Sequence, residues 1–99
     1  MLEYGREIAE LMRGKTLVDL RDDRMLQLSV ARLLEILGEA ARRLSNKFRA
    51  AHPEVPWREI AGMRNRLVHV YDDINLGVVW RTATEDVPRL IETLERLAR

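Results

Sequence analysis

The sequence predicts an all-α domain, and three observations carry this prediction. Apolar residues recur at three- and four-residue steps through most of the chain, a spacing that places them along one face of a helix. Strand signals are scarce, whereas helix-forming residues dominate the composition. The length of 99 residues suits a single domain, spanning 1–99, that buries enough surface to fold alone.

Composition narrows the cellular setting. The chain has no cysteine, which excludes disulfides and thiolate metal sites and fits a reducing compartment. It has no signal peptide and no apolar run approaching 18 residues, so we expect a cytoplasmic protein without a membrane span. The formal net charge of +1 argues against a simple polybasic nucleic-acid binder.

Charge is nevertheless unevenly distributed along the chain. Residues 42–71 hold seven basic residues against two acidic ones, a local charge of +5, and each flank carries −2. Most such clusters are simply solvated helical faces. This one also contains the most distinctive motif of the sequence, so a polyanionic partner is an equally good interpretation.

The first helix is expected to run from Leu2 to about Arg13 and to end at Gly14, which suits the position after a helix C-cap. Its predicted buried stripe consists of Tyr4, Ile8 and Leu11 or Met12. The segment Lys15–Asp23 follows as a connector with a short helical turn over 17–20. The opening residues resemble the interior of a first helix, so we expect this helix to be truncated.

The longest predicted helix runs from Arg24 to about Ala51. Its apolar residues follow nearly heptad spacing: Leu26, Val30, Leu33, Leu37, Ala40, Leu44 and Phe48. Leu34 and Ile36 widen the apolar surface beyond one stripe. Gly38 and Ala41 would let another backbone approach closely, at a cost of about 1 kcal/mol for the glycine. The approaching backbone is either a helix of the same chain or the twofold mate of a homodimer, and periodicity does not separate the two.

Two prolines make residues 52–56 a rigid turn, because each disfavours helix in the residue before it. His52 beside this turn is interpreted as a capping or surface residue. A further helix follows over Trp57–Tyr71. Residues 72–75 supply N-cap candidates for the last helix, whose predicted stripe is Leu76, Val79 or Trp80, Ala83, Val87, Leu90, Leu94 and Leu97. Pro88 predicts a kink near 84–87, with Thr84 as a local cap.

The helix over Trp57–Tyr71 carries the reactive residues. Arg64 interrupts its apolar face and therefore needs a carboxylate, a carbonyl or a ligand phosphate as a partner. Tyr71 returns to the same side two turns later. His69 points about 140° from Arg64 on an ideal helix, in line with Asn65. One site containing Arg64 and His69 thus requires a distorted helix end or a second chain.

Structural interpretations of these residues compete with catalytic ones. Arg64 on an apolar face is often a buried ion pair, here with Glu35 or Glu39. A histidine in the last turn of a helix interacts favourably with the helix dipole and needs no other role. Spacing alone favours these interpretations, since isolated motifs are often false positives. Metal binding is a poor alternative, because only His69 with Asp72 and Asp73 approaches ligand spacing.

The pattern Arg-Asn-x-x-x-His-x-Tyr resembles the signature of the HEPN superfamily, specifically its minimal HepT-like toxins. The stretches LLEILGEAARRLS, HPEVPWREIAGMRNRLVHVYDDI and VVW…TEDVPRLIETL extend the resemblance over roughly residues 24 to 95. The resemblance implies an up-down four-helix bundle. It also favours a catalytic role for Arg64 and His69 over the structural roles that spacing alone favours. It also implies a metal-independent endoribonuclease acting on RNA in a cleft between two subunits of a homodimer. No cofactor is implied.

The resemblance assigns roles to four residues. His69 and Arg64 become catalytic and Asn65 supports them, in keeping with the chemistry of imidazole and guanidinium groups. Tyr71 becomes the site where a partner antitoxin, a minimal nucleotidyltransferase, attaches AMP; Val70 beside it is larger than the residue that relatives often have. The alternative function is a catalytically inactive helical dimer that binds nucleotide or the partner nucleotidyltransferase.

Overall fold

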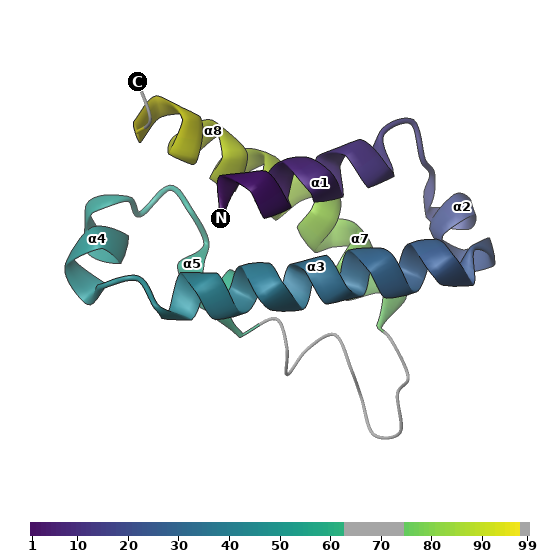
Figure 1. Ribbon diagram of the computed structural model, residues 1–99, viewed down its shortest axis with the longest axis horizontal. Helices are drawn as coiled ribbons and strands as arrows, with labels where there is room; N and C mark the ends of the chain where they lie inside the picture. Colours follow the sequence, from purple (N-terminus) through teal and green to yellow (C-terminus); the bar gives the residue numbers. More distant parts are fainter. Residues whose placement is uncertain (63–74, 98–99) are drawn as a thin grey trace.

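The computed structural model describes residues 1–62 and 75–97, and every regular element within these ranges is a helix (Figure 1). The predicted all-α class is therefore confirmed. The elements are α1 (Leu2–Met12), α2 (Leu17–Asp22), α3 (Arg24–Arg42), α4 (Asn46–Ala51), α5 (Trp57–Ala61), α7 (Leu76–Arg81), the π-helical η2 (Thr82–Asp86) and α8 (Val87–Leu97). Helix α3 runs along the molecule, with α4 and α5 at one end and α2 at the other. Helix α1 packs against both α3 and α8.

Helix α1 buries most of the predicted stripe, with one exception. Gly5, Ile8 and Met12 are buried, whereas Tyr4 is 37% exposed, so its place in the buried stripe was wrong. Gly5 is buried beside Ile8 and Met12, because its missing side chain lets α8 come close. A Cβ added at Gly5 would lie 3.1 Å from Cγ1 of Ile91. After the helix, Gly14 adopts a φ of +71°, as expected for the residue that terminates it.

The predicted connector turn is a capped helix, α2. The Thr16 hydroxyl accepts a hydrogen bond from the Asp19 backbone N–H, and the Asp19 carboxylate accepts one from the Thr16 backbone N–H. This reciprocal pair is a capping box. At the other end, the buried Gln27 amide donates to the carbonyls of Leu20 and Arg21, at 3.0 and 2.8 Å. Gln27 thereby ties the end of α2 to α3.

One continuous helix from Arg24 to Ala51 was a wrong prediction, since α3 ends at Arg42 and α4 begins at Asn46. The physical reason is Ser45, whose hydroxyl accepts a 3.0 Å hydrogen bond from the Phe48 backbone N–H. A serine offers the chain this local cap in place of continued α-helical bonding.

The buried stripe of α3 is also shifted from the heptad prediction. Leu34 and Ala41 are buried, whereas Leu33 and Ala40 are only half-buried. Gly38 is buried as well. Gly38 and Ala41 are therefore covered within a single chain, and they do not provide the free surface for a twofold mate that the sequence suggested.

The last helix is interrupted where the sequence predicted a kink. Thr82–Asp86 forms a π-helical segment, in which the Val87 backbone N–H donates to the Thr82 carbonyl five residues earlier. Pro88, which lacks an N–H, follows directly. Thr84 is not a cap, because its hydroxyl donates to the Trp80 carbonyl at 2.7 Å. In the predicted stripe, Leu97 is instead exposed.

The core of the described chain is formed mainly by aliphatic residues of α1, α3, α5 and the last helical region. Its fully buried members of largest volume include Ile8, Leu20, Leu34, Leu37, Ile60 and Leu90. Across 1–62 and 75–97, no helix is both long and apolar enough to cross a bilayer.

Candidate active site

The residues predicted to carry the chemistry lie outside the described part of the chain. Arg64, Asn65, His69 and Tyr71 all fall within 63–74, between α5 and α7. The structure defines the two elements that flank this segment in sequence, α5 and α7.

The start of α5 is fixed by the indole of Trp57. Its Nε1–H donates a 2.8 Å hydrogen bond to the His52 carbonyl, while the ring itself is buried. The Phe48 ring packs edge-on against it, with centroids 6.0 Å apart. Ile60, one turn later, is buried in the core, and α5 packs on α3. These contacts set the direction in which the chain enters the segment 63–74.

His52 has structural contacts, as its position beside the turn suggested. Its ring lies 4.8 Å from that of Phe48, and its Nδ1 lies 3.7 Å from a carboxylate oxygen of Glu54. Its carbonyl accepts the Trp57 hydrogen bond. These contacts give His52 a place in the turn between α4 and α5.

Asn75 begins the element on the far side of the segment. Its Oδ1 accepts a hydrogen bond from the Val78 backbone N–H at 3.1 Å, which caps α7 as one of the predicted N-cap candidates. Val79 then anchors α7, since it is completely buried. The chain therefore leaves the segment 63–74 into a capped and anchored helix.

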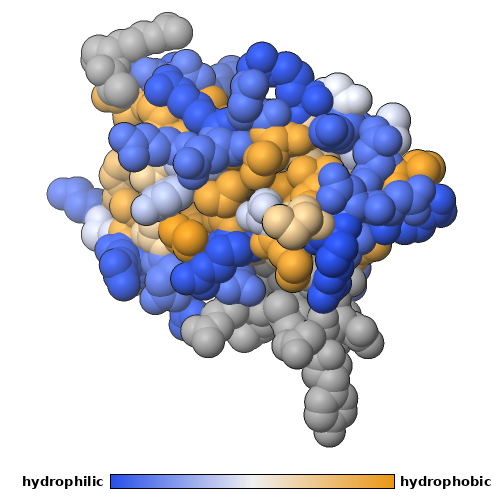
Figure 2. Space-filling view, turned by 45° about the vertical axis from the view of Figure 1, so that its right-hand side comes forward, coloured by the Kyte–Doolittle hydropathy of each residue, from blue (hydrophilic) through white to orange (hydrophobic). Residues whose placement is uncertain are grey.

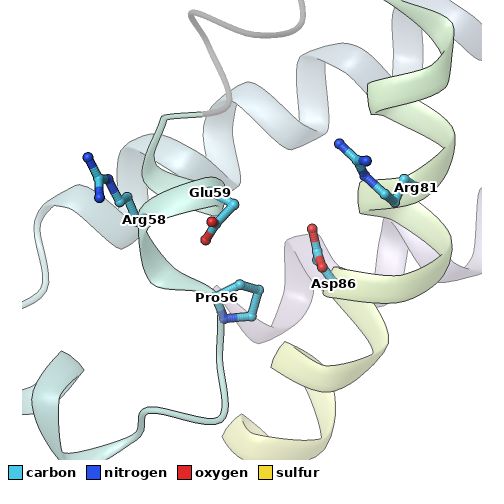
Figure 3. A pocket seen from close by; sticks show the side chains of 5 residues that line it. All are labelled: Pro56, Arg58, Glu59, Arg81 and Asp86. Atoms are coloured by element: carbon cyan, nitrogen blue, oxygen red, sulfur yellow. The ribbon is translucent and has the colours of Figure 1, made fainter.

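An open pocket of about 620 Å³ lies between α5 and the α7–η2 region. Its lining consists of Pro56, Arg58, Glu59, Arg81 and Asp86 (Figure 3). The carboxylates of Glu59 and Asp86 point toward the pocket from opposite walls, and Arg58 and Arg81 stand on either side. The sequence contained no signal that would bring Arg81 and Asp86 to this place, because η2 changes the helical register.

The π-helical wall carries one further unusual group. Thr82 is buried, and its hydroxyl has no hydrogen-bond partner among the described residues. π-helical turns occur frequently at functional sites.

Other sequence predictions concern residues outside this pocket. Glu35, which the sequence offered as a partner for Arg64, pairs with Arg32 at 3.2 Å. Within 1–62 and 75–97, no group of three or more His, Asp or Glu side chains is arranged to hold a metal ion.

These features define a class of protein. An all-helical domain in which α1, α3 and the last helical region pack together, with an Arg-x4-His motif between α5 and α7, is a HEPN-type helical bundle. The chain belongs to the ribonuclease HepT-like family, whose model matches residues 1–97.

Individual relatives agree with this assignment. A protein of Thermococcus cleftensis named "Probable ribonuclease HepT" is 41% identical over 92 residues, which cover 93% of this chain and 84% of the relative. Proteins from Methanocaldococcus jannaschii and Caldanaerobacter subterraneus, both provisionally named as RNases, are 36% and 37% identical. They are covered over 87% of their length, and the matches span 96% and 98% of this chain. No solved structure matches the chain.

Proposed function

We propose that this protein is a metal-independent endoribonuclease in which His69 and Arg64 are catalytic and Asn65 supports them. The observation that carries the proposal is the family match, which extends over residues 1–97 and so includes the whole RNRLVH motif. The names of the relatives, one a probable ribonuclease, support the same reaction class.

The proposed reaction is an internal transfer within the RNA backbone. A base removes the proton of the 2′-hydroxyl, the 2′-oxygen bonds to the adjacent phosphorus, and the bond from phosphorus to the 5′-oxygen breaks. The leaving 5′-oxygen takes a proton, which leaves a 2′,3′-cyclic phosphate and a 5′-hydroxyl. An unperturbed imidazole changes its charge near neutral pH, and this chemistry suits His69 to the proton transfers. The guanidinium of Arg64 stabilises the negative charge that develops on the phosphate oxygens.

The proposed reaction gives a chemical reason to expect a homodimer. One catalytic histidine per chain, His69, cannot serve as base and acid in the same step, so a second copy near the cleft would supply the other group. Exposed apolar residues on α2 and α3 support self-association, because Met25 is 74% exposed and Leu28 46%. Leu17 and Val18 add to this surface. Figure 2 shows apolar side chains that reach the surface in a band between hydrophilic ones. Light scattering at micromolar concentration should report twice the chain mass, and a monomer would contradict the shared site.

The proposal includes regulation by a partner. A cognate minimal nucleotidyltransferase, the antitoxin of a toxin–antitoxin pair, would transfer AMP to the Tyr71 hydroxyl. The adduct would add a negative charge and a bulky adenosine two residues from His69. Both would oppose the approach of an RNA backbone to Arg64.

The activity is tested with purified protein and single-stranded RNA in a buffer that contains EDTA. The wild-type chain should cleave the RNA, and His69→Ala and Arg64→Ala should each lose activity by about 10²-fold or more. If the wild-type chain is inactive but still binds the nucleotidyltransferase, the alternative of a catalytically inactive helical dimer is correct.

A further inference from the structure

We propose that Arg58 and Arg81 hold a backbone phosphate of the RNA beside the one that is cleaved. This inference rests on the proposed endoribonuclease function and deepens it, because it assigns a substrate-positioning site to two residues outside the motif. The site is the pocket between α5 and the α7–η2 region.

The position of the pocket relates it to the motif. Helix α5 ends at Ala61, three residues before Arg64, and α7 begins at Leu76, five residues after Tyr71. Arg58 comes from the first of these helices and Arg81 from the second, and both line the same pocket (Figure 3). The two elements that flank the motif therefore face each other across a space whose lining includes arginine and acidic side chains from both sides.

The pocket lining holds two arginines and two carboxylates, so its formal charges balance. Arg58 and Arg81 are exposed, and neither forms an ion pair or side-chain hydrogen bond within the described residues. Other exposed arginines of the described chain are paired, among them Arg13 with Glu10 at 2.7 Å and Arg32 with Glu35 at 3.2 Å. Glu59 and Asp86, the acids of the pocket, each interact with another group. The two guanidinium groups are thus available for a ligand.

The chemistry of the lining selects a single phosphate of a flexible strand. Guanidinium groups present a planar set of donors that matches phosphate oxygens. Two carboxylates in the same pocket would repel a dense array of phosphates, which disfavours a rigid duplex lying across it. A volume of about 620 Å³ accommodates one nucleotide of a single strand. In this role Arg58 and Arg81 position the substrate and do not take part in bond breaking.

The test measures RNA binding and cleavage separately. Arg58→Gln and Arg81→Gln are prepared in a His69→Ala background, and their affinity for a fluorescent single-stranded RNA is measured by anisotropy at several salt concentrations. Each substitution should weaken binding by about tenfold. The double substitution should also lower the slope of log Kd against log salt by ~0.7, the value for one phosphate contact on a single strand. With His69 intact, KM should rise while kcat stays within about threefold.

Arg13→Gln is the matched control, because it removes the same charge from an exposed arginine at the C-terminal end of α1, outside the pocket. It should leave affinity and salt slope unchanged. Thermal unfolding should be the same for all three variants, since Arg13, Arg58 and Arg81 are all exposed. Wild-type affinity in both pocket variants, or a loss of kcat without a change in affinity, would overturn the positioning role and leave the endoribonuclease function standing. A wild-type chain that neither binds nor cleaves RNA would overturn both.

Discussion

The indole of Trp57 donates a 2.8 Å hydrogen bond to the backbone carbonyl of His52, across a turn that contains two prolines. The bond joins the end of α4 to the start of α5. Because α5 leads directly into the segment that carries Arg64 and His69, this contact orients the chain where it enters the proposed site.

Trp57→Phe keeps most of the buried ring and removes the donor. We expect a loss of about 1–2 kcal/mol in the free energy of unfolding, because the half-buried His52 carbonyl loses the indole donor and keeps only the longer bond from the Val55 backbone N–H, at 3.3 Å. Urea denaturation followed by far-UV circular dichroism measures the change. Trp80→Phe is the control, since Trp80 is half-buried and its ring N–H makes no hydrogen bond among the described residues. Equal losses in the two variants would contradict the role of the indole bond.

The break between α3 and α4 depends on Ser45. Ser45→Ala removes the acceptor for the Phe48 backbone N–H and should cost about 1 kcal/mol in unfolding free energy. Ser29→Ala, an exposed position within α3, should be neutral or stabilise by up to about 0.5 kcal/mol, because alanine has the higher helix propensity. Chemical denaturation of both variants checks the pair. A neutral Ser45→Ala would show that the break is imposed by packing and not by the cap.

The capping box of α2 makes the stability of the protein depend on pH. The hydrogen bond from the Thr16 backbone N–H, with a further one from the Thr16 side chain, holds the pKa of Asp19 below its ordinary value of 3.8. The contribution of this carboxylate to stability is therefore fully present above that value and is lost as the pH falls through the lower folded-state pKa. NMR titration of the Asp19 carboxyl should show the lowered pKa, and Thr16→Ala should raise it. Thr84→Ala, in η2, should leave it unchanged.

Modification at Tyr71 is tested by co-expression with the cognate nucleotidyltransferase. Intact-mass spectrometry should show the addition of one AMP group, formed when the phenol oxygen attacks the α-phosphate of ATP and pyrophosphate leaves. Tyr71→Phe should abolish the addition and leave the protein toxic in the presence of the partner. The chain has one other tyrosine, Tyr4, which is partly exposed on α1, so Tyr4→Phe is the matched control and should still be modified. An adduct that persists in Tyr71→Phe would contradict this assignment.

The sequence predicted the elements of the fold better than their boundaries and faces. Apolar spacing located α1, α3 and the last helical region, and Gly14 and Asn75 marked helix ends because their roles are local. Spacing did not reveal that Gly5 would face α8, since that depends on a neighbour 86 residues away in sequence, Ile91. Ser45 was overlooked because an apolar pattern continues through it, although its hydroxyl cap was sufficient to end the long helix.

The candidate site was also predicted only in part from the sequence. The motif was visible because its residues lie close together in the sequence and resemble a family signature. The pocket beside it was not, because Arg58 and Arg81 are 23 positions apart. Their approach depends on how α5 and α7 pack against α3 and on the π-helical register of η2. Those are tertiary features, and helical periodicity carries no information about them.

The most direct test of the central claim is single-turnover cleavage of a single-stranded RNA in EDTA, by the wild-type chain and by His69→Ala, with analysis of the product ends. The wild-type chain should yield 2′,3′-cyclic phosphate or 3′-phosphate ends and 5′-hydroxyl ends, and His69→Ala should be slower by about 10²–10⁴-fold. Cleavage that EDTA abolishes, products with 5′-phosphate ends, or a His69→Ala variant as fast as the wild type would contradict the account.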